Sequence, residues 1–275
     1  MLSPRIGLAL SGGAARGLAH AGVLRALSEN GIRIDCVAGT SAGSLVAGAF
    51  ASGMSVEDIT DFGRKLRWRD IGRVTMSRLG VQSNERLEQY LRARLPITKF
   101  EDMQIPFAAV ATDLNTGEAV VMKGEGDVPF AIRASCTIPG WYVPVLDQEG
   151  RQLVDGGLVA VVPSTVTRSL AAEIVIAVDV NSEGATFITP SSSVIGVLLQ
   201  SLMLVQKAAS SFQLEMADLV ISPKVGHIRW DEMGRADELI EAGYNAGLES
   251  IPRIRAVIES VSDKETEPQI ARIYY

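Results

Sequence analysis

The sequence alternates short runs of apolar, strand-forming residues with longer segments of helical periodicity. Parallel strands need long crossover connections, which are usually helices that pack onto the faces of the sheet. The alternation therefore predicts an α/β fold in which a mainly parallel central sheet is covered by helices on both faces. Strands are predicted at residues 5–10, 34–38, 107–111, 119–122, 152–154, 174–179 and 219–221, and helices at 18–30, 44–52, 56–64, 85–94, 194–214 and 237–262.

Composition excludes several other classes of protein. With 47% hydrophobic residues among 275, the chain can bury a large core, so it is not a disordered protein. Two cysteines and two histidines are too few for a disulfide scaffold or for a cysteine- or histidine-rich metal site. The net charge of −6 argues against nucleic acid as a partner. The length fits one large or two small domains, and the best candidate for a loop is at 184–193.

Apolar runs that could serve as targeting or membrane-spanning segments are short. The N-terminal run is too short for a signal sequence, and the longest later run, at 194–205, is interrupted by Gln200 and Ser201. We therefore expect a cytoplasmic protein.

The segment Arg64–Arg78 is rich in basic side chains and contains one acidic residue, Asp70. It could hold the protein against an anionic membrane surface as a peripheral protein, or it could be an ordinary solvated face. Its basic residues are Arg64, Lys65, Arg67, Arg69, Arg73 and Arg78.

Ligands of parallel α/β sheets bind where the strands end, and three segments of unusual composition follow predicted strands. The first is the glycine-rich loop Ser11–Gly17, which precedes a helix. Glycines such as Gly12 and Gly13 let backbone N–H groups point at an anion, either a phosphate or a transient oxyanion. A dinucleotide-binding loop is the alternative, but Ala14 stands where that motif requires its second glycine.

The second segment, Gly39-Thr40-Ser41-Ala42-Gly43, matches the G-x-S-x-G pattern of a nucleophile elbow. In an elbow the serine occupies a strained turn from strand to helix, and side chains at the flanking positions would collide with both elements. Gly39 and Gly43 satisfy that demand, and an apolar strand and a helix of small residues provide the required context.

The third segment is Asp155-Gly156-Gly157, where a carboxylate at a strand end could accept a serine proton. The order Ser41, Asp155, His227 also matches the chain order of an α/β-hydrolase triad, and His20 is the other candidate base. Sequence order alone does not decide between these bases.

Together and in this order, the three segments resemble the patatin-like phospholipase family, in particular its small bacterial members. The resemblance extends over residues 5–179 and takes in Val110–Gly117 and the block Arg133–Pro144. Within that block, Arg133–Tyr142 could wall an acyl pocket or form a packed core loop.

The resemblance implies roles for the residues of these motifs. It makes Ser41 the nucleophile and Asp155 the base of a Ser–Asp dyad, with no essential histidine. The oxyanion hole and its support are then formed by the glycine-rich loop, with donors at Gly12, Gly13 and Ala14 and with Arg16 in the family's basic position before Gly17. Ser11 and Ala14 depart from the usual glycine run, but each keeps its backbone N–H.

The resemblance also implies a three-layer α/β/α fold and a function. We accordingly expect a single patatin-like domain over residues 1–275, with the motifs in a core at 5–179 and a helical elaboration at 190–262. The expected reaction is hydrolysis of a lipid or other acyl ester through an acyl-enzyme, without a metal ion or cofactor. Two other functions stay open. One is a non-catalytic patatin scaffold that regulates a partner protein, against which the intact Ser41 and Asp155 argue. The other is a nucleotide-dependent oxidoreductase, against which Ala14 argues.

Overall fold

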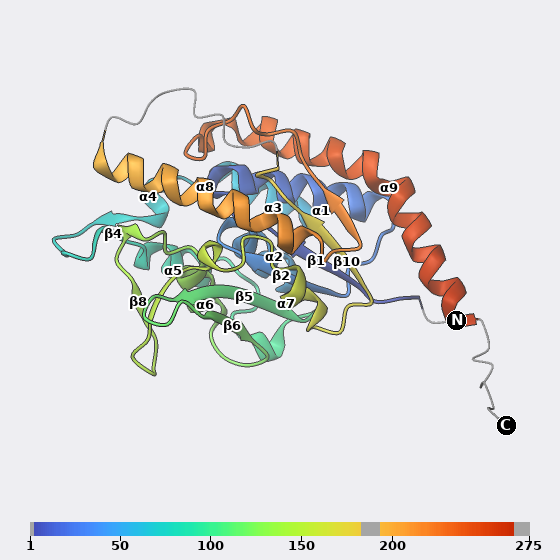
Figure 1. The fold of residues 1–275 in the computed structure, drawn as a ribbon, viewed down its shortest axis with the longest axis horizontal. Coiled ribbons are helices and arrows are strands. Elements are labelled where there is room, and N and C mark those ends of the chain that lie inside the picture. The colour runs from blue at the N-terminus through green and yellow to red at the C-terminus, as the bar shows by residue number, and fades with distance from the viewer. Residues whose placement is uncertain (1–2, 183–192, 267–275) are drawn as a thin grey trace.

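The computed structural model describes residues 3–182 and 193–266 of the chain (Figure 1). The loop predicted at 184–193 lies outside these residues except for Ser193, and so does the beginning of the predicted elaboration, 190–192. The strands are β1 (Ile6–Leu10), β2 (Cys36–Thr40), β3 (Arg73–Val74), β4 (Gly80–Ser83), β5 (Phe107–Asp113), β6 (Ala119–Lys123), β7 (Gly140–Tyr142), β8 (Val145–Leu146), β9 (Gln152–Asp155), β10 (Ile174–Val178) and β11 (Leu219–Ile221). The α-helices are α1 (Ala19–Glu29), α2 (Ala42–Ala51), α3 (Val56–Lys65), α4 (Trp68–Ile71), α5 (Glu85–Arg92), α6 (Val128–Ser135), α7 (Ser164–Arg168), α8 (Val194–Leu214) and α9 (Ala236–Thr266), and the 3-10 helices are η1 (Ala14–Leu18), η2 (Phe100–Asp102), η3 (Gly156–Leu158) and η4 (Met233–Arg235).

The main sheet has the strand order β11-β10-β1-β2-β5-β9-β8, and β6 also pairs with β5. From β11 to β5 neighbouring strands run parallel, whereas β6, β8 and β9 pair antiparallel. Every residue of β1, β2, β5 and β10 is buried, as expected for parallel strands that are covered on both faces. The predicted α/β fold with a mainly parallel central sheet is confirmed.

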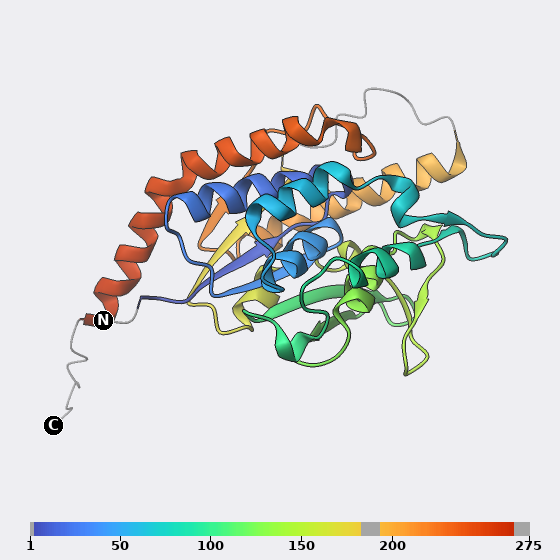
Figure 2. The ribbon, with the colours of Figure 1, turned by 180° about the vertical axis from the view of Figure 1, so that it is seen from behind.

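Helices cover the sheet on both sides (Figures 1 and 2). On one face, Leu8 and Leu10 of β1 belong to the main core, together with residues of α1, α2, α3 and α9. On the other face, small side chains such as Ala9 pack with residues beside α7 and at the end of α8. Helix α7 comes so close that a Cβ on Gly7 would lie 2.5 Å from Cγ2 of Thr167. This is the three-layer arrangement that the resemblance implied.

Strand β5 has three partners, and two of them share one of its edges. Strand β6 pairs with residues 108–112 of β5 and therefore occupies one whole edge of that strand. Strands β2 and β9 must then share the other edge, where β2 pairs with residues 107–110 and β9 with residues 111–113. Thr40 of β2 pairs with Val110, and Asp155 of β9 pairs with the next residue, Ala111. Since Ser41 follows Thr40, this edge brings Ser41 and Asp155 together.

Some elements differ from their predicted positions. The second strand is Cys36–Thr40 rather than residues 34–38, because Ile34 is buried in the main core without joining the sheet. The predictions for β11 and α8 match the structure at both ends. Neither α6 nor the hairpin of β3 and β4 was predicted from the sequence pattern. The hairpin forms a small second sheet with β7.

Helices α1 and α9 pack so closely that glycine is required where they touch. A Cβ on Gly22 of α1 would lie 1.9 Å from the carbonyl oxygen of Ile240, and one on Gly243 of α9 would lie 1.9 Å from the carbonyl oxygen of Ala19. No relaxation of a side chain can relieve either clash, because the obstructing atoms belong to the backbone. The two glycines therefore set the distance between α9 and the rest of the main core.

We expect Gly243→Ala to lower the free energy of unfolding by about 1–3 kcal/mol, the usual range for an overpacked core. The matched control is Gly234→Ala in η4, where a Cβ would meet no atom within 4 Å. The control should change stability by less than about 0.5 kcal/mol. Urea denaturation measures both variants, and equal stabilities would contradict the close helix contact.

Candidate active site

Ser41 lies at the turn between β2 and α2 with a positive φ of 51° and a ψ of −125°. A residue with a side chain adopts such a conformation only where the surrounding structure imposes it. The predicted flanking glycines are required by the tightness of the turn. A Cβ on Gly39 would lie 2.4 Å from the carbonyl oxygen of Gly43, and one on Gly43 would lie 2.2 Å from that of Leu10. The turn has the strained strand-to-helix geometry of a nucleophile elbow.

The hydroxyl of Ser41 donates a hydrogen bond of 2.6 Å to Oδ2 of Asp155. The other carboxylate oxygen, Oδ1, accepts the backbone N–H of Gly157 at 2.8 Å. Asp155 is only 5% exposed, and this burial, which the two hydrogen bonds oppose, raises the pKa of its carboxyl to about 6. A carboxylate in this position can take the proton of the serine hydroxyl at neutral pH.

The backbone around Asp155 is fixed on both sides. Its N–H donates to the carbonyl of Thr137 at 2.8 Å, and its carbonyl accepts the hydroxyl of Thr112 at 3.0 Å. A Cβ on Gly156 would lie 2.1 Å from the carbonyl oxygen of Val110, so the chain can turn away from β5 here only with glycine. The second residue of the predicted Asp-Gly-Gly motif, Gly156, is therefore a glycine for steric reasons.

The glycine-rich loop lines the same cavity as Ser41 and Asp155. Within the described parts of the chain, the backbone N–H groups of Gly13 and Ala14 have no hydrogen-bond acceptor, and Ala14 has a positive φ of 49°. Gly12, which was expected to be a third donor, instead donates its N–H to the carbonyl of Val161 at 2.9 Å. Two amides of the loop, rather than three, are available to an oxyanion.

Buried polar groups hold the glycine-rich loop from behind. The hydroxyl of Ser11 accepts the N–H of Val180 at 3.1 Å, and a Cβ on Gly17 would lie 2.4 Å from Cβ of Ala42 in the elbow. The guanidinium of Arg16 donates to the carbonyl of Ile228 at 2.7 Å, and burial lowers its pKa. Arg16 therefore binds the backbone behind the loop, and it does not line the cavity of Ser41.

Ser135 supports the elbow, a role that was not predicted from the sequence. The hydroxyl of Ser135 accepts the backbone N–H of Ser41 at 2.8 Å and donates to the carbonyl of Val110 at 2.6 Å. This bridge ties the elbow to β5 and occupies the amide of Ser41. The only sequence signal for it was its place in the block Arg133–Pro144.

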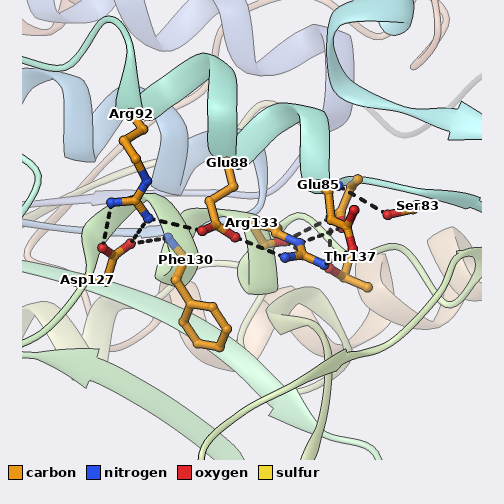
Figure 3. Close-up of polar contacts among 9 residues, drawn as sticks. Ser83, Glu85, Glu88, Arg92, Asp127, Phe130, Arg133 and Thr137 are labelled. Atoms are coloured by element: carbon orange, nitrogen blue, oxygen red, sulfur yellow. Dashed lines mark hydrogen bonds and ion pairs between the residues drawn. The ribbon is translucent and has the colours of Figure 1, made fainter.

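Helix α6, which carries that serine, is fastened to α5 by charged side chains (Figure 3). Arg133 of α6 donates to Glu88 of α5 at 2.9 Å. Arg92 of α5 reaches the two oxygens of Asp127 at 2.9 and 3.0 Å. Asp127 also caps α6 by accepting the N–H of Phe130 at 2.9 Å. The network fixes the position and the start of the helix that supports the elbow.

Two cavities meet at Ser41. We call the first the apolar cavity, and part of the predicted block forms its wall; its lining includes Leu45, Leu87, Cys136, Ile138, Tyr142 and Met233. We call the second the α8 cavity, since it lies beneath α8, where Lys207 and Asn181 provide polar groups beside apolar side chains. The serine hydroxyl thus lies where an apolar space joins a more polar one.

Neither histidine contacts the Ser41–Asp155 pair. His20 is fully buried, which lowers its pKa to about 4, and its Nε2 lies 2.8 Å from the carbonyl oxygen of Ser11. His227 is at the surface, with its Nε2 2.8 Å from a carboxylate oxygen of Glu238. The described residues therefore contain a serine–carboxylate pair without the geometry of a triad. Nor do three or more His, Cys, Asp or Glu side chains in these residues gather into a metal site.

Residues 8–167 match the sequence model of the patatin-like phospholipases, and the match contains the glycine-rich loop, the elbow and Asp155. The chain belongs to the patatin-like phospholipase family. An uncharacterised NTE family protein of Mycobacterium tuberculosis is 37% identical to this patatin-like chain over 186 residues, which are 66% of the chain and 51% of the relative. A lysophospholipase of Mycosarcoma maydis is 40% identical over 185 residues, 64% of the chain and 10% of that relative.

The patatin-like chain thus spans about half the length of the mycobacterial relative, and less of the fungal one. Among solved structures, VipD from Legionella pneumophila has a similar fold, with a TM-score of 0.54 and 13% identity over 94% of this chain and 67% of VipD. At that identity the likeness concerns the fold alone.

The raised pKa of Asp155 has a consequence for stability. The folded state holds the proton more tightly than the unfolded state does, so the ionised carboxyl destabilises the fold. This free-energy cost of ionisation is absent when the pH is below 3.8, the ordinary pKa of the group. It is complete when the pH is above the raised pKa of about 6. We expect Asp155→Asn, which stays neutral, to raise the free energy of unfolding at pH 8 by about 2–3 kcal/mol. The gain should shrink toward pH 5. Urea denaturation at both pH values tests this, and an Asn variant less stable than the unmodified protein at pH 8 would contradict it.

Proposed function

We propose that the protein is a lipid acyl hydrolase that cleaves fatty-acyl ester bonds with Ser41 as nucleophile and Asp155 as base. The observation that carries the proposal is the hydrogen bond of 2.6 Å between these two side chains at a strained elbow. Membership of the patatin-like phospholipase family and the name of the fungal lysophospholipase relative support a lipid substrate.

In the proposed reaction, Oγ of Ser41 attacks the ester carbonyl while Oδ2 of Asp155 takes the hydroxyl proton. The negative charge that develops on the carbonyl oxygen is stabilised by the free N–H groups of Gly13 and Ala14, and each such donor lowers the barrier by about 3 kcal/mol in comparable sites. The alcohol leaves with the proton from Asp155. A water molecule, deprotonated by the same carboxylate, then attacks the acyl-enzyme. The bond between the acyl group and Oγ of Ser41 breaks, Oγ takes the proton back from Asp155, and the fatty acid is released.

The two cavities determine how the substrate is oriented at Ser41. The apolar cavity receives the acyl chain, since its lining is almost wholly carbon. The α8 cavity receives the alcohol moiety, where Lys207 and Asn181 can bind polar groups. In this orientation the ester carbonyl lies between Ser41 and the free amides of the loop.

We propose further that the chain acts as one domain rather than as a core with a detachable C-terminal part. Helix α9 packs against α1, and α8 forms one side of the cavity that contains Ser41. Arg16 of the glycine-rich loop is bonded to Ile228.

Replacing either member of the pair should abolish hydrolysis of p-nitrophenyl butyrate. We expect Ser41→Ala and Asp155→Asn to lower kcat by about a thousandfold or more. Alanine lacks the attacking oxygen, and the asparagine amide cannot accept the proton. The matched control is His227→Ala, which should keep kcat within about tenfold. Circular dichroism checks that each variant is folded. If His227→Ala were as inactive as Ser41→Ala, the dyad mechanism would be wrong and a triad that includes His227 would be favoured.

The pH dependence of the reaction should reflect the ionisation of Asp155. Only the ionised carboxylate can accept the proton, and its pKa is raised by burial to about 6. We therefore expect kcat/KM for a soluble ester to rise with pH, to reach half its maximum near pH 6 and to level off above it. Initial rates across this range provide the test, and a rate that falls as pH rises through 6 would rule out Asp155 as the base.

A further inference from the structure

The hairpin of β3 and β4 presents large apolar side chains to water. Val74 is 73% exposed, Met76 is 103% exposed and Leu79 is 58% exposed. None of the three belongs to a hydrophobic core of the described residues. Apolar side chains that gather on a protruding element and stabilise no core mark a surface that binds something apolar.

The basic side chains of Arg64–Arg78 divide into two groups. Those near α3 are engaged within the protein: Arg64 pairs with Asp61 and Asp237, Lys65 pairs with Asp61, and Arg67 donates to backbone carbonyls. In the described part of the chain, the side chains of Arg69, Arg73 and Arg78 have no hydrogen bond or ion pair. Arg73 directly precedes Val74, and Arg78 directly precedes Leu79. The free positive charge therefore lies where the apolar side chains are.

Helix α8 is apolar on its outer side as well as on the side that faces the site. Leu199, Leu202 and Met203 line the α8 cavity, while other apolar side chains of the same helix face solvent. The exposed ones, which we call the α8 stripe, are Val194 (77%), Val197 (51%), Leu198 (64%), Leu204 (56%), Val205 (65%) and Phe212 (73%). Of these, Leu204 also borders the α8 cavity. An exposed apolar stripe along a helix suits a position in the interface of a membrane. No helix of the described residues has the length and apolarity to cross a membrane.

The hairpin and the first turns of α8 lie at the same end of the molecule in both views (Figures 1 and 2). We propose that together they dock the protein onto a lipid bilayer with anionic headgroups. In the docked state Val74, Met76 and Leu79 enter the acyl region, while Arg73 and Arg78 bind the headgroups. The choice of a lipid occupant rests on the proposed function and on this combination of apolar and unpaired basic side chains.

The hairpin is joined directly to the wall of the apolar cavity. Strand β4 pairs in parallel with β7, with Gly80 opposite Gly140 and Gln82 opposite Tyr142. A Cβ on Gly80 would lie 2.6 Å from the backbone of Tyr142, so the two strands are in close contact. Tyr142 and Ile138 both line the apolar cavity. A bilayer that holds the hairpin is thereby held next to the space proposed for the acyl chain.

Co-sedimentation with vesicles tests the docking surface without relying on turnover. The protein carries Ser41→Ala, so that vesicles stay intact, and the vesicles contain phosphatidylcholine with or without phosphatidylglycerol. The key pair is Met76→Gln and Met76→Leu, which cannot differ through packing because Met76 is fully exposed. We expect Met76→Gln to weaken binding to the anionic vesicles by about tenfold or more, and Met76→Leu to bind as the parent does.

Two further variants separate the contributions of charge and of α8. Arg73→Gln combined with Arg78→Gln should weaken binding to anionic vesicles by about tenfold and flatten its dependence on salt. Leu198→Gln on the α8 stripe should weaken binding to a similar extent as Met76→Gln.

Three results would overturn the docking surface. The first is that the parent protein does not bind anionic vesicles. The second is that the two Met76 variants bind equally. The third is that the parent forms a dimer that Met76→Gln dissociates. The last result would assign the surface to a second copy of the chain. Hydrolysis of soluble p-nitrophenyl butyrate by the unmodified protein is measured separately. If that activity is absent while vesicle binding follows the expected pattern, the proposed function fails and the docking surface stands.

Discussion

The contact between Ser41 and Asp155 depends on the way two strands divide one edge of β5. β2 pairs with β5 as far as Val110, and β9 continues from Ala111, so the end of one strand meets the end of the other. Two residues that are 114 positions apart in sequence are thereby held within a hydrogen bond. The close packing that this requires explains the glycine at position 156, which has the carbonyl of Val110 directly beside it.

The site concentrates features that destabilise a protein. Ser41 and Ala14 have positive φ angles, two amides lack acceptors within the described residues, and a carboxyl group is buried with a raised pKa. Each is held by a neighbour rather than by its own local preference. Ser135 bonds the amide of Ser41, and the ion pairs between α5 and α6 hold the helix that carries Ser135. Support of this kind keeps reactive groups in place before a substrate arrives.

Local patterns in the sequence were enough to locate the elbow, the glycine-rich loop and the Asp155 motif, because each depends on steric demands made by adjacent residues. The same holds for α8, whose ends follow from its own composition. Features that depend on distant parts of the chain were not predictable in this way. The engagement of the Gly12 amide requires the position of Val161, the role of Ser135 requires β5, and the shift of β2 requires that Ile34 be buried beside the sheet rather than in it.

The anchoring of the glycine-rich loop has a consequence for the order in which the site is completed. Ala15 donates its N–H to the carbonyl of Trp230 at 2.8 Å, and Arg16 is bonded to the carbonyl of Ile228. A ribosome releases the chain from its N-terminus, so Ser41 and Asp155 emerge well before these two partners. The part of the site proposed to receive the oxyanion is therefore the last to gain its support. If the proposed reaction depends on this support, a nascent chain lacks it until residues 228–230 have been made.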